Sequence, residues 1–293
     1  MLSSKPINIK IGTRSSKLAL AQVAEVHLLL SELPYKLNID IIPIKTSGDI
    51  NNVGSLAEIG GKGLFVKELE LALLNKTIDI AVHSSKDMPP VLACGTDIVA
   101  TTQRLNPFDC LISRYPNLSS LSDLPQASKI GTCSPRRTAF LQMIRPDLQI
   151  ICMRGNIDTR LNKLKNKEVD ALILAYAGLE RIECQHLAQF IFTVEQMLPA
   201  GGQGCLSLQT RNDDQLINSI AKLINHQDSH LCLTAERQFL LQMQADCTTP
   251  IGCYATVNDS SLTLHTATFD NGQCFKKQFT STDLSEQAIK NMI

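Results

Sequence analysis

Short apolar segments alternate with longer helical patterns early in the chain, and this alternation restricts the fold more than any other feature. The predicted order is a strand at 7–13, a helix at 16–33, a strand at 37–44, a helix at 63–74 and a strand at 78–82. Strands and helices of these lengths in this order are typical of βαβ units, which build a mostly parallel sheet. The first part of the chain is therefore predicted to be an α/β domain.

A second α/β pattern begins after Pro107, without sequence similarity to the first. It comprises strands at 129–131, 148–153 and 171–174 and helices at 135–144 and 159–167. Two α/β domains with a cleft between them form the architecture of hinged anion-binding proteins. We therefore expect a ligand site between the two domains.

From about residue 225 the pattern becomes α+β. A helix near 231–243 precedes alternating segments at 251–257, 262–269 and 274–280, and Asn271-Gly272 between the last two is a hairpin-turn signal. These features predict a small C-terminal domain with an antiparallel sheet.

Composition argues against several kinds of partner. Lys plus Arg and Asp plus Glu each number 28, so no overall field favours nucleic acid or an anionic membrane. Aromatic residues make up only 4% of the chain and Trp is absent, which leaves few platforms for stacking bases. No apolar run has transmembrane length, and residues 1–10 do not have the pattern of a signal peptide. We therefore expect a cytoplasmic protein that binds neither nucleic acid nor membranes.

The ten cysteines are dispersed and form no CxxC pair, and no His lies at zinc-finger spacing. This pattern predicts no metal site. Most of the thiols are expected to be small buried apolar groups in a reducing compartment.

Arginines stand where predicted strands give way to helices. Arg14 follows the first strand, Arg136 and Arg137 begin a helix, Arg154 ends a strand, and Arg160 lies in the first turns of the next helix. In open α/β sheets, ligands bind beyond the carboxyl ends of the strands, where helix N-termini favour anions. Any one of these arginines is explained equally well as solvated surface. Together they indicate a ligand with several carboxylates or phosphates, because helix N-termini usually carry acidic residues.

Lys86-Asp87 follows the strand at 78–82 and precedes the rigid Pro89-Pro90. A carboxylate held there could accept a proton or stabilise a cation, but Asp87 could equally be a helix cap in a surface turn. The Gly-rich segment 60–65 lacks the Walker spacing, so it is either a mobile lid or a plain flexible loop.

Five segments resemble the porphobilinogen deaminase (hydroxymethylbilane synthase) family in their order and spacing. They are Thr13-Arg14-Ser15-Ser16, the segment 60–70 with sequence GGKGLFVKELE, the segment 81–87 with sequence AVHSSKD, Arg154-Gly155-Asn156, and the segment 198–204 with sequence LPAGGQG.

The resemblance implies two α/β domains like those of periplasmic binding proteins, a central cleft, and a small α+β C-terminal domain. It places domain 1 at 1–103 and 203–223, domain 2 at 108–199 and domain 3 at 226–293. A monomer is expected. The family also implies a covalent dipyrromethane cofactor, and the matching attachment residue here is Cys247, although a lone Cys is by itself more often structural.

The resemblance further assigns roles to individual residues. Asp87 is implied to be catalytic, with Phe65 and Gln203 as lid or positioning residues. The residues implied to bind cofactor or substrate are Arg14, Ser16, Lys62, Lys86, Thr132, Ser134, Arg136, Arg137, Arg154, Arg160 and Arg181. The substrate is implied to be porphobilinogen, whose acetate and propionate arms suit a cationic cleft. Four porphobilinogens would condense on the cofactor, with loss of ammonia, to give a linear tetrapyrrole.

Glu58 and Asp246 depart from the usual family pattern by adding carboxylates near a polyanionic ligand. In a partly solvated cleft each is expected to weaken binding by about 1 kcal/mol. A family member with reduced turnover and a non-catalytic hinged anion-binding protein therefore remain as alternatives.

Overall fold

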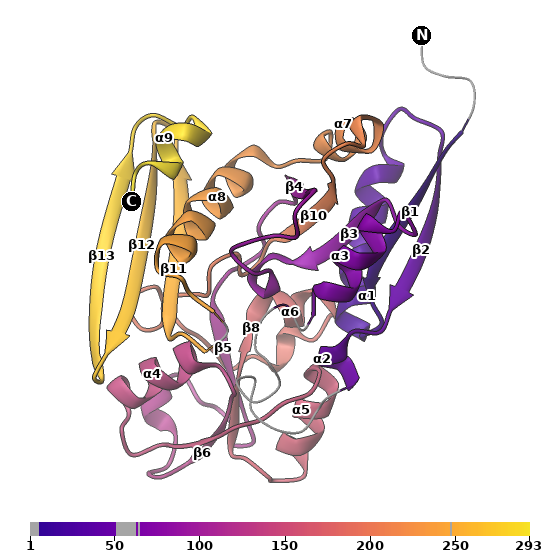
Figure 1. Ribbon diagram of the computed structural model, residues 1–293. Coiled ribbons are helices and arrows are strands. Elements are labelled where there is room, and N and C mark those ends of the chain that lie inside the picture. Colours follow the sequence, from indigo (N-terminus) through magenta and orange to yellow (C-terminus); the bar gives the residue numbers. More distant parts are fainter. Residues whose placement is uncertain (1–5, 51–62, 64, 247) are drawn as a thin grey trace.

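The computed structural model describes residues 6–50, 63, 65–246 and 248–293. Its strands form two five-stranded sheets and one three-stranded sheet, each with its own helices (Figure 1). The predicted fold class is confirmed: two α/β domains are accompanied by a small α+β domain.

The first sheet has the strand order β2-β1-β3-β10-β4. Its strands are β1 (Ile7–Arg14), β2 (Leu37–Ile44), β3 (Ile80–Ser84), β4 (Thr96–Thr101) and β10 (Leu206–Arg211). Strand β1 runs parallel to β2 and β3, whereas β10 is antiparallel to β3 and β4. The accompanying helices are α1 (Lys17–Ser31), α2 (Ser47–Ile50), the 3₁₀ turn η1 (Ser85–Asp87), α3 (Lys67–Leu74) and α7 (Gln215–Lys222). Apolar side chains of α1 and α7 pack with those of β1, β3 and β10 in one core cluster.

The second sheet repeats this arrangement with the order β7-β6-β8-β5-β9. Its strands are β5 (Asp109–Ser113), β6 (Lys129–Gly131), β7 (Gln149–Ile151), β8 (Ala171–Ala175) and β9 (Phe190–Ile191). Strand β6 is parallel to β7 and β8, and β5 is antiparallel to β8 and β9. Its helices are η2 (Leu121–Asp123), α4 (Pro135–Ile144), α5 (Ile157–Lys165), α6 (Tyr176–Arg181) and η3 (Gln185–Leu187).

The third sheet is an antiparallel meander covered by two helices. Its elements are α8 (Gln227–Gln242), β11 (Ile251–Asn258), β12 (Ser261–Asp270), β13 (Gln273–Ser281) and α9 (Glu286–Lys290). Asn271 and Gly272 between β12 and β13 have φ values of +48° and +78°. Two successive positive φ angles are the geometry of a type I′ hairpin turn, so the predicted hairpin is confirmed.

A buried carboxylate of α8 ties the third domain to both chain segments that cross between the α/β domains. Glu236 pairs with Arg104 at 2.7 Å and accepts hydrogen bonds from the backbone N–H groups of Gly202 and Ala255. Arg104 lies in the segment from β4 to β5, and Gly202 in the segment from β9 to β10. One carboxylate, that of Glu236, therefore holds the third domain against both crossing segments.

Several predicted boundaries shift by a few residues. The strand predicted at 78–82 is β3 at Ile80–Ser84, because His83 and Ser84 pair with Ser207 and Leu206 of β10. Strands β4, β5 and β10 lie outside the βαβ pattern on which the prediction was based.

The prediction of mostly buried cysteines is wrong for the described part of the chain. Cys94 and Cys152 are exposed, and Cys133, Cys184 and Cys274 are half-buried. Three of these, Cys94, Cys133 and Cys152, lie in loops beyond the ends of strands, where the chain is too close to solvent for full burial.

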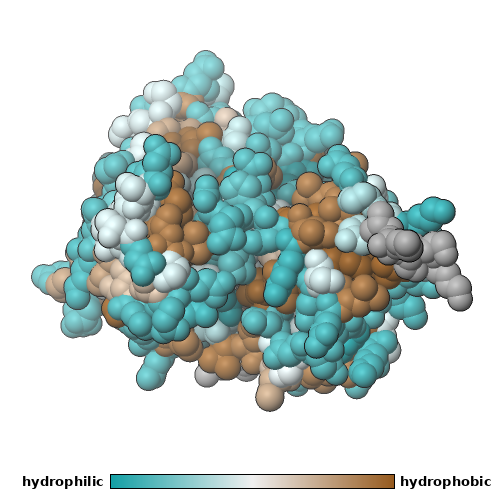
Figure 2. Space-filling model, turned by 90° about the horizontal axis from the view of Figure 1, so that it is seen from above, coloured by the Kyte–Doolittle hydropathy of each residue, from teal (hydrophilic) through white to brown (hydrophobic). Residues whose placement is uncertain are grey.

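Hydrophilic residues cover much of the face seen in Figure 2, and the apolar residues there gather in separate patches. None of the helices in the described ranges is both long and apolar enough to cross a membrane.

Candidate active site

The first domain places Arg14 and Asp87 beyond the ends of two neighbouring parallel strands. Arg14 is the last residue of β1, and Ser16 caps α1 by accepting a hydrogen bond from the backbone N–H of Ala19 at 3.3 Å. Asp87 ends the 3₁₀ turn that follows β3, and its side chain is exposed. An N-terminal helix end, a cation and an accessible carboxylate therefore share one edge of the sheet.

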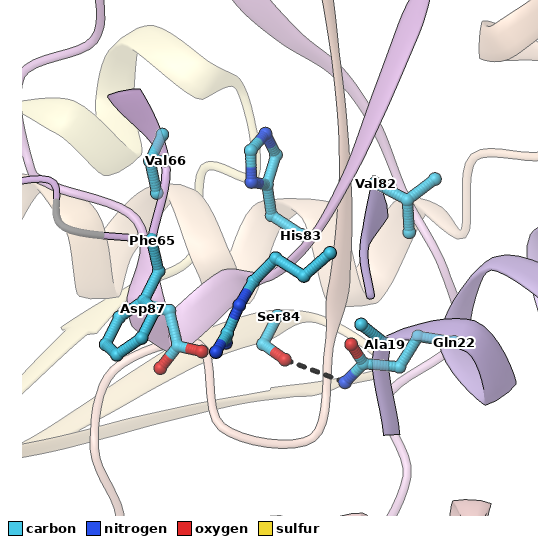
Figure 3. Close-up of a pocket in the computed structure, with 9 residues that line it drawn as sticks. Ala19, Gln22, Phe65, Val66, Val82, His83, Ser84 and Asp87 are labelled. Carbon is cyan, nitrogen blue, oxygen red and sulfur yellow. Dashed lines mark hydrogen bonds between the residues drawn. The ribbon is translucent and has the colours of Figure 1, made fainter. Parts of the chain in front are cut away.

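A small pocket lies between these groups (Figure 3). Arg14, Gln22, Phe65, Ser84 and Asp87 are among its lining residues. The Arg14 guanidinium lies 4.1 Å from the centre of the Phe65 ring, and Gln22 Nε2 donates to Ser84 Oγ at 2.7 Å. The cation–π contact fixes the direction of the Arg14 charge, so the predicted positioning residue Phe65 does contact a predicted binding residue.

His83 forms part of the pocket wall but supplies no charge to it. It is buried and its Nε2 is 3.0 Å from Gln209 Oε1. Burial, only partly offset by this hydrogen bond, lowers the pKa of His83 to about 4. The ring is therefore neutral at physiological pH.

The second domain contributes the start of α4. Ser134 caps this helix by accepting from the backbone N–H of Arg137, and Pro135 occupies its first turn, where a missing N–H costs nothing. Thr132 Oγ1 in turn accepts from the backbone N–H of Ser134 at 3.2 Å. The two predicted hydroxyl residues thus organise the loop between β6 and α4.

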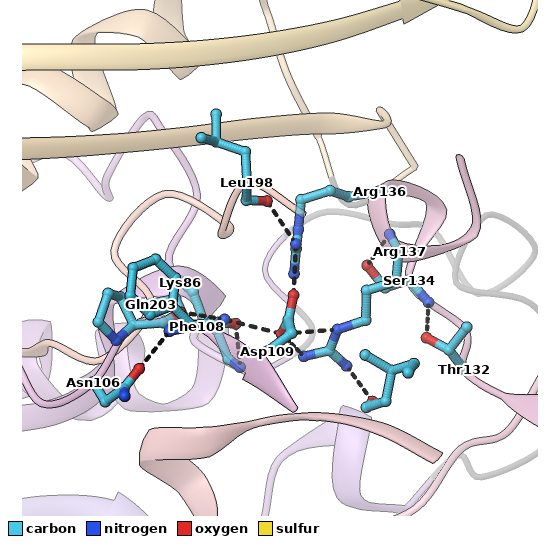
Figure 4. A network of polar contacts seen from close by, with 12 residues as sticks. Lys86, Asn106, Phe108, Asp109, Thr132, Ser134, Arg136, Arg137, Leu198 and Gln203 are labelled. Atoms are coloured by element: carbon cyan, nitrogen blue, oxygen red, sulfur yellow. Dashed lines mark hydrogen bonds and ion pairs between the residues drawn. The ribbon is translucent and has the colours of Figure 1, made fainter. Parts of the chain in front are cut away.

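Asp109 is the centre of a polar network that sequence reasoning missed (Figure 4). It is fully buried and lies 2.7 Å from both Arg136 Nη1 and Arg137 Nη2. Burial raises the pKa of Asp109, but the charges of Arg136 and Arg137 outweigh this effect and hold the pKa well below its usual value. A carboxylate at the head of the apolar segment Cys110–Ile112 was the available signal, since a charge in a buried strand needs a partner.

The same network reaches across to the first domain. Gln203 donates to Asp109 at 3.0 Å and accepts from Lys86 Nζ at 3.1 Å. Gly202 beside it has a φ of +75°, and a Cβ there would come within 2.8 Å of Ser85 Cβ. The glycine therefore allows this crossing segment to lie directly against the loop that carries Lys86.

Part of the Lys86 side chain is exposed to solvent, but its ammonium group is surrounded by protein atoms and other charges. Loss of hydration, and next the charge of Arg137, lower the pKa of Lys86 to about 8, against the opposing effect of Asp87 and Asp109. The ammonium group is consequently still mostly charged at pH 7, and an incoming carboxylate would relieve the repulsion around it.

The loop between β7 and α5 supplies two further cations. Arg154 Nη2 is buried and has no hydrogen-bond partner among the described residues. Arg160 Nε donates to the backbone carbonyl of Gly155 at 2.9 Å, and its guanidinium senses the charges of both Arg137 and Asp87. A buried guanidinium N–H without a partner is costly, so Arg154 is suited to an anionic ligand.

Arg181 has a different environment from the other predicted binding residues. It ends α6 and pairs with Glu25 of α1 at 2.8 Å, while its Nη2 donates to the carbonyl of Gly204 at 3.1 Å. These contacts bridge the two α/β domains.

Two predicted site residues, Lys62 and Cys247, lie outside the described residues, as does Glu58. Next to Cys247, the Asp246 carboxylate accepts hydrogen bonds from the backbone and hydroxyl of Thr248 and from the hydroxyl of Thr249. These bonds lower the pKa of Asp246, and its carboxylate is used in local hydrogen bonds to Thr248 and Thr249.

The donors around this site suit a ligand with several carboxylates. Cations come from both α/β domains, and helix N-termini accompany them. Arg154 Nη2 has no hydrogen-bond acceptor within the described part of the chain. In the part of the chain that the structure describes, no group of three or more His, Cys, Asp or Glu is placed to hold a metal ion. Fold and site together are those of a protein with two α/β domains and a small α+β domain, in which an accessible carboxylate lies among cations suited to an anionic ligand.

Comparison with known proteins defines the family. Residues 9–219 match the family model described as porphobilinogen deaminase, dipyromethane cofactor binding domain, and residues 230–290 match porphobilinogen deaminase, C-terminal domain. The porphobilinogen deaminase of Orientia tsutsugamushi (strain Boryong) is 46% identical over 250 residues, which cover 85% of this chain and 83% of the relative. That of Limosilactobacillus reuteri (strain DSM 20016) is 43% identical over 253 residues, covering 86% and 83%.

Among solved structures, the methionine binding protein MetQ is 15% identical with a TM-score of 0.48, covering 74% of this chain and 89% of MetQ. The chain belongs to the porphobilinogen deaminase family. The predictions of this family, of a transferase and of a dipyrromethane cofactor are therefore confirmed.

Proposed function

We propose that this chain is a hydroxymethylbilane synthase that condenses four porphobilinogens, with loss of ammonia, on a dipyrromethane primer. One observation carries the proposal: the exposed Asp87 carboxylate lies within the electrostatic reach of Lys86 and Arg160 at the edge of the first sheet. Cations alone would suit any anion-binding protein. Asp87, unlike the buried and fully paired Asp109, is an exposed carboxylate among these cations, so it is available to stabilise positive charge that develops on a substrate.

The carboxylate arms of substrate and cofactor would be held by residues of both α/β domains. Arg14, Ser16 and Lys86 serve from the first domain, and Lys62 is assigned there by its family position. Thr132, Ser134, Arg154 and Arg160 serve from the second. Because each pyrrole adds two carboxylates, a growing chain needs several such partners. Arg154 Nη2, for which the described residues supply no acceptor, is suited to this purpose.

Asp87 would accept hydrogen bonds from pyrrole N–H groups and stabilise the positive charge that develops on porphobilinogen as ammonia departs. Fixed charges placed where charge develops are among the largest contributions to catalysis, because they need no reorganisation during the reaction. The role is electrostatic and requires Asp87 to be ionised.

Cys247 would attach the cofactor through a thioether. When bound, the dipyrromethane supplies an unsubstituted pyrrole carbon that acts as the nucleophile for the first substrate. The chain's own contribution is to bind and orient the carboxylate arms and to hold negative charge at Asp87.

The main role of Arg136, Arg137 and Gln203 would be to position other groups of the site. Their side chains surround Asp109, which fixes them relative to Lys86. Arg136 Nη1 also donates to the Leu198 carbonyl and Arg137 Nη1 to the Ile173 carbonyl, so these buried guanidinium groups would act on ligand carboxylates mainly through their charge. Arg181 would support the site by pairing with Glu25 across the two domains, in addition to the ligand contact that its family position implies.

We also propose the division into domain 1 at 1–103 and 203–223, domain 2 at 108–199 and domain 3 at 226–293. The shared sheet of β1 to β4 with β10 supports a discontinuous first domain. We further propose a cytoplasmic monomer, as the family resemblance implies. The zero net charge supports the expectation that it binds neither nucleic acid nor membranes, because no overall field attracts polyanions.

The proposal is tested by the stoichiometry of the reaction. The purified protein is expected to release one ammonia for each porphobilinogen consumed and to form a product of four linked pyrroles, measured by an ammonia assay and by mass spectrometry. A protein that binds porphobilinogen without releasing ammonia would instead be the non-catalytic anion-binding alternative.

A further inference from the structure

Two thiols that the proposed function does not use meet beside the carboxylate-binding loops. Cys133 is the second residue after β6, between Thr132 and Ser134, and Cys152 directly follows β7. Because β6 and β7 are adjacent parallel strands, with Gly131 opposite Ile151, their following loops lie side by side. The two sulfur atoms are 2.6 Å apart and share a hydrogen bond.

This geometry suits a covalent bond between the two sulfurs. A disulfide requires an S–S distance of about 2.05 Å, so the sulfurs need to approach by only about half an ångström. Cys152 is exposed and Cys133 is half-buried, so a small reagent can reach the pair. Both are free thiols here.

The charges and burial around the pair determine which of the two thiols reacts first. Arg154 and Arg160 both act on Cys133 and favour its thiolate. Burial, the hydrogen bond to Cys152 and the charge of Cys152 nevertheless raise the pKa of Cys133 to about 12. The exposed Cys152 is therefore the thiol that reacts first.

We propose that Cys133 and Cys152 form a reversible disulfide that lowers the activity of the neighbouring carboxylate-binding site. The regulatory part rests on the proposed function. The oxidant is a small-molecule disulfide such as oxidised glutathione.

The chemistry proceeds by two thiol–disulfide exchanges. The Cys152 thiolate attacks the small disulfide, forming a mixed disulfide and releasing one thiolate. The Cys133 thiolate then attacks Cys152 Sγ and displaces the second small thiolate, and these two products take up the two protons lost by the cysteines. Two cysteine thiols are oxidised by two electrons in total, and one small disulfide is reduced to two thiols.

The cross-link would join the loop that carries Thr132 and Ser134 to the loop that carries Arg154. Both loops have to adapt as the ligand lengthens by one pyrrole at each step. A misplacement of about 1 Å in a group that positions substrate can cost about 100-fold in rate. A partial restraint on these loops is therefore expected to lower turnover by about tenfold, scaled from that figure.

Disulfide formation is tested on the purified protein with its cofactor attached. The protein is equilibrated with oxidised glutathione, its remaining thiols are blocked with N-ethylmaleimide, and it is digested with trypsin. Cys133 and Cys152 then fall in separate peptides, 130–136 and 138–154, since trypsin does not cleave between Arg145 and Pro146. The linked pair is expected at the summed peptide mass less two hydrogens, and to be lost in Cys152→Ser. Cys94→Ser, which removes another exposed thiol, is expected to retain it.

Activity is measured on the same samples before and after reduction with dithiothreitol. The expected result is an about tenfold loss of turnover that dithiothreitol reverses and that Cys152→Ser does not show. Absence of the linked peptides overturns the proposal, and a disulfide that leaves turnover unchanged overturns its regulatory part. A protein that forms the disulfide but is inactive when reduced refutes the proposed function and establishes the disulfide alone.

Discussion

Substitution of Asp87 by asparagine is expected to lower the turnover number by about 10²- to 10³-fold while leaving the fold intact. The amide retains the size of the carboxylate but removes the negative charge that we propose stabilises the substrate cation as ammonia departs. Because Asp87 is exposed, the free energy of unfolding should change by no more than about 0.5 kcal/mol. Steady-state kinetics with porphobilinogen and urea unfolding measure the two effects.

KM separates this role from simple binding. Loss of an anion beside Lys86 and Arg160 leaves their attraction for substrate carboxylates intact, so KM should stay the same or fall. Asp213→Asn serves as the control, since Asp213 is an exposed aspartate before α7. Full turnover in Asp87→Asn would remove Asp87 from its proposed role.

Substitution of Asp109 by asparagine is expected to destabilise the protein by about 3–5 kcal/mol. The change leaves two buried guanidinium groups, those of Arg136 and Arg137, without their counter-charge. Asp147→Asn is the matched control, because Asp147 forms an ion pair of equal length with Arg145 in the same domain but closer to solvent. That variant should lose only about 0–1 kcal/mol in urea unfolding. Equal losses of unfolding free energy in both variants would show that the buried ion pairs of Asp109 contribute no more to stability than the exposed pair of Asp147.

The ion pairs of Asp109 also predict how the free energy of unfolding changes at low pH. The folded pKa of Asp109 lies below the ordinary value of 3.8, so the folded protein holds this carboxylate ionised where the unfolded chain would protonate it. Its contribution is therefore complete above about pH 4 and declines as the pH falls further, by at most about 1.4 kcal/mol per pH unit. The wild-type protein should lose stability more steeply than Asp109→Asn in this range. Parallel slopes would contradict the ion-paired state of Asp109.

The two α/β patterns could be recognised in the sequence because buried helix faces and buried strands carry apolar residues at regular local spacing. Strand β10 could not, because its place depends on pairing with β3 about 120 residues earlier, as in the contact between Leu206 and Ser84. That pairing also explains why β3 extends to Ser84. The position of β10 and the end of β3 therefore depend on long-range strand pairing, which local periodicity does not record.

The candidate site divides in the same way. Arg14, Lys86 and Asp87 could be placed at strand ends from sequence alone, and the structure has them there. Asp109 could not be connected to Arg136 and Arg137, because 27 and 28 residues separate them and nothing local marks the pair. The proximity of Cys133 and Cys152 likewise depends on β6 and β7 being neighbours in the sheet.

Intact-mass measurement tests most directly whether the chain builds a pyrrole oligomer on Cys247. The purified wild-type protein is predicted to carry the added mass of two linked pyrroles and, with porphobilinogen, to gain further increments of one pyrrole at a time. Cys247→Ser should show the mass of the bare chain under both conditions, and Cys94→Ser should behave as the wild type. A wild-type protein that carries no added mass and gains none with porphobilinogen would contradict the proposed function.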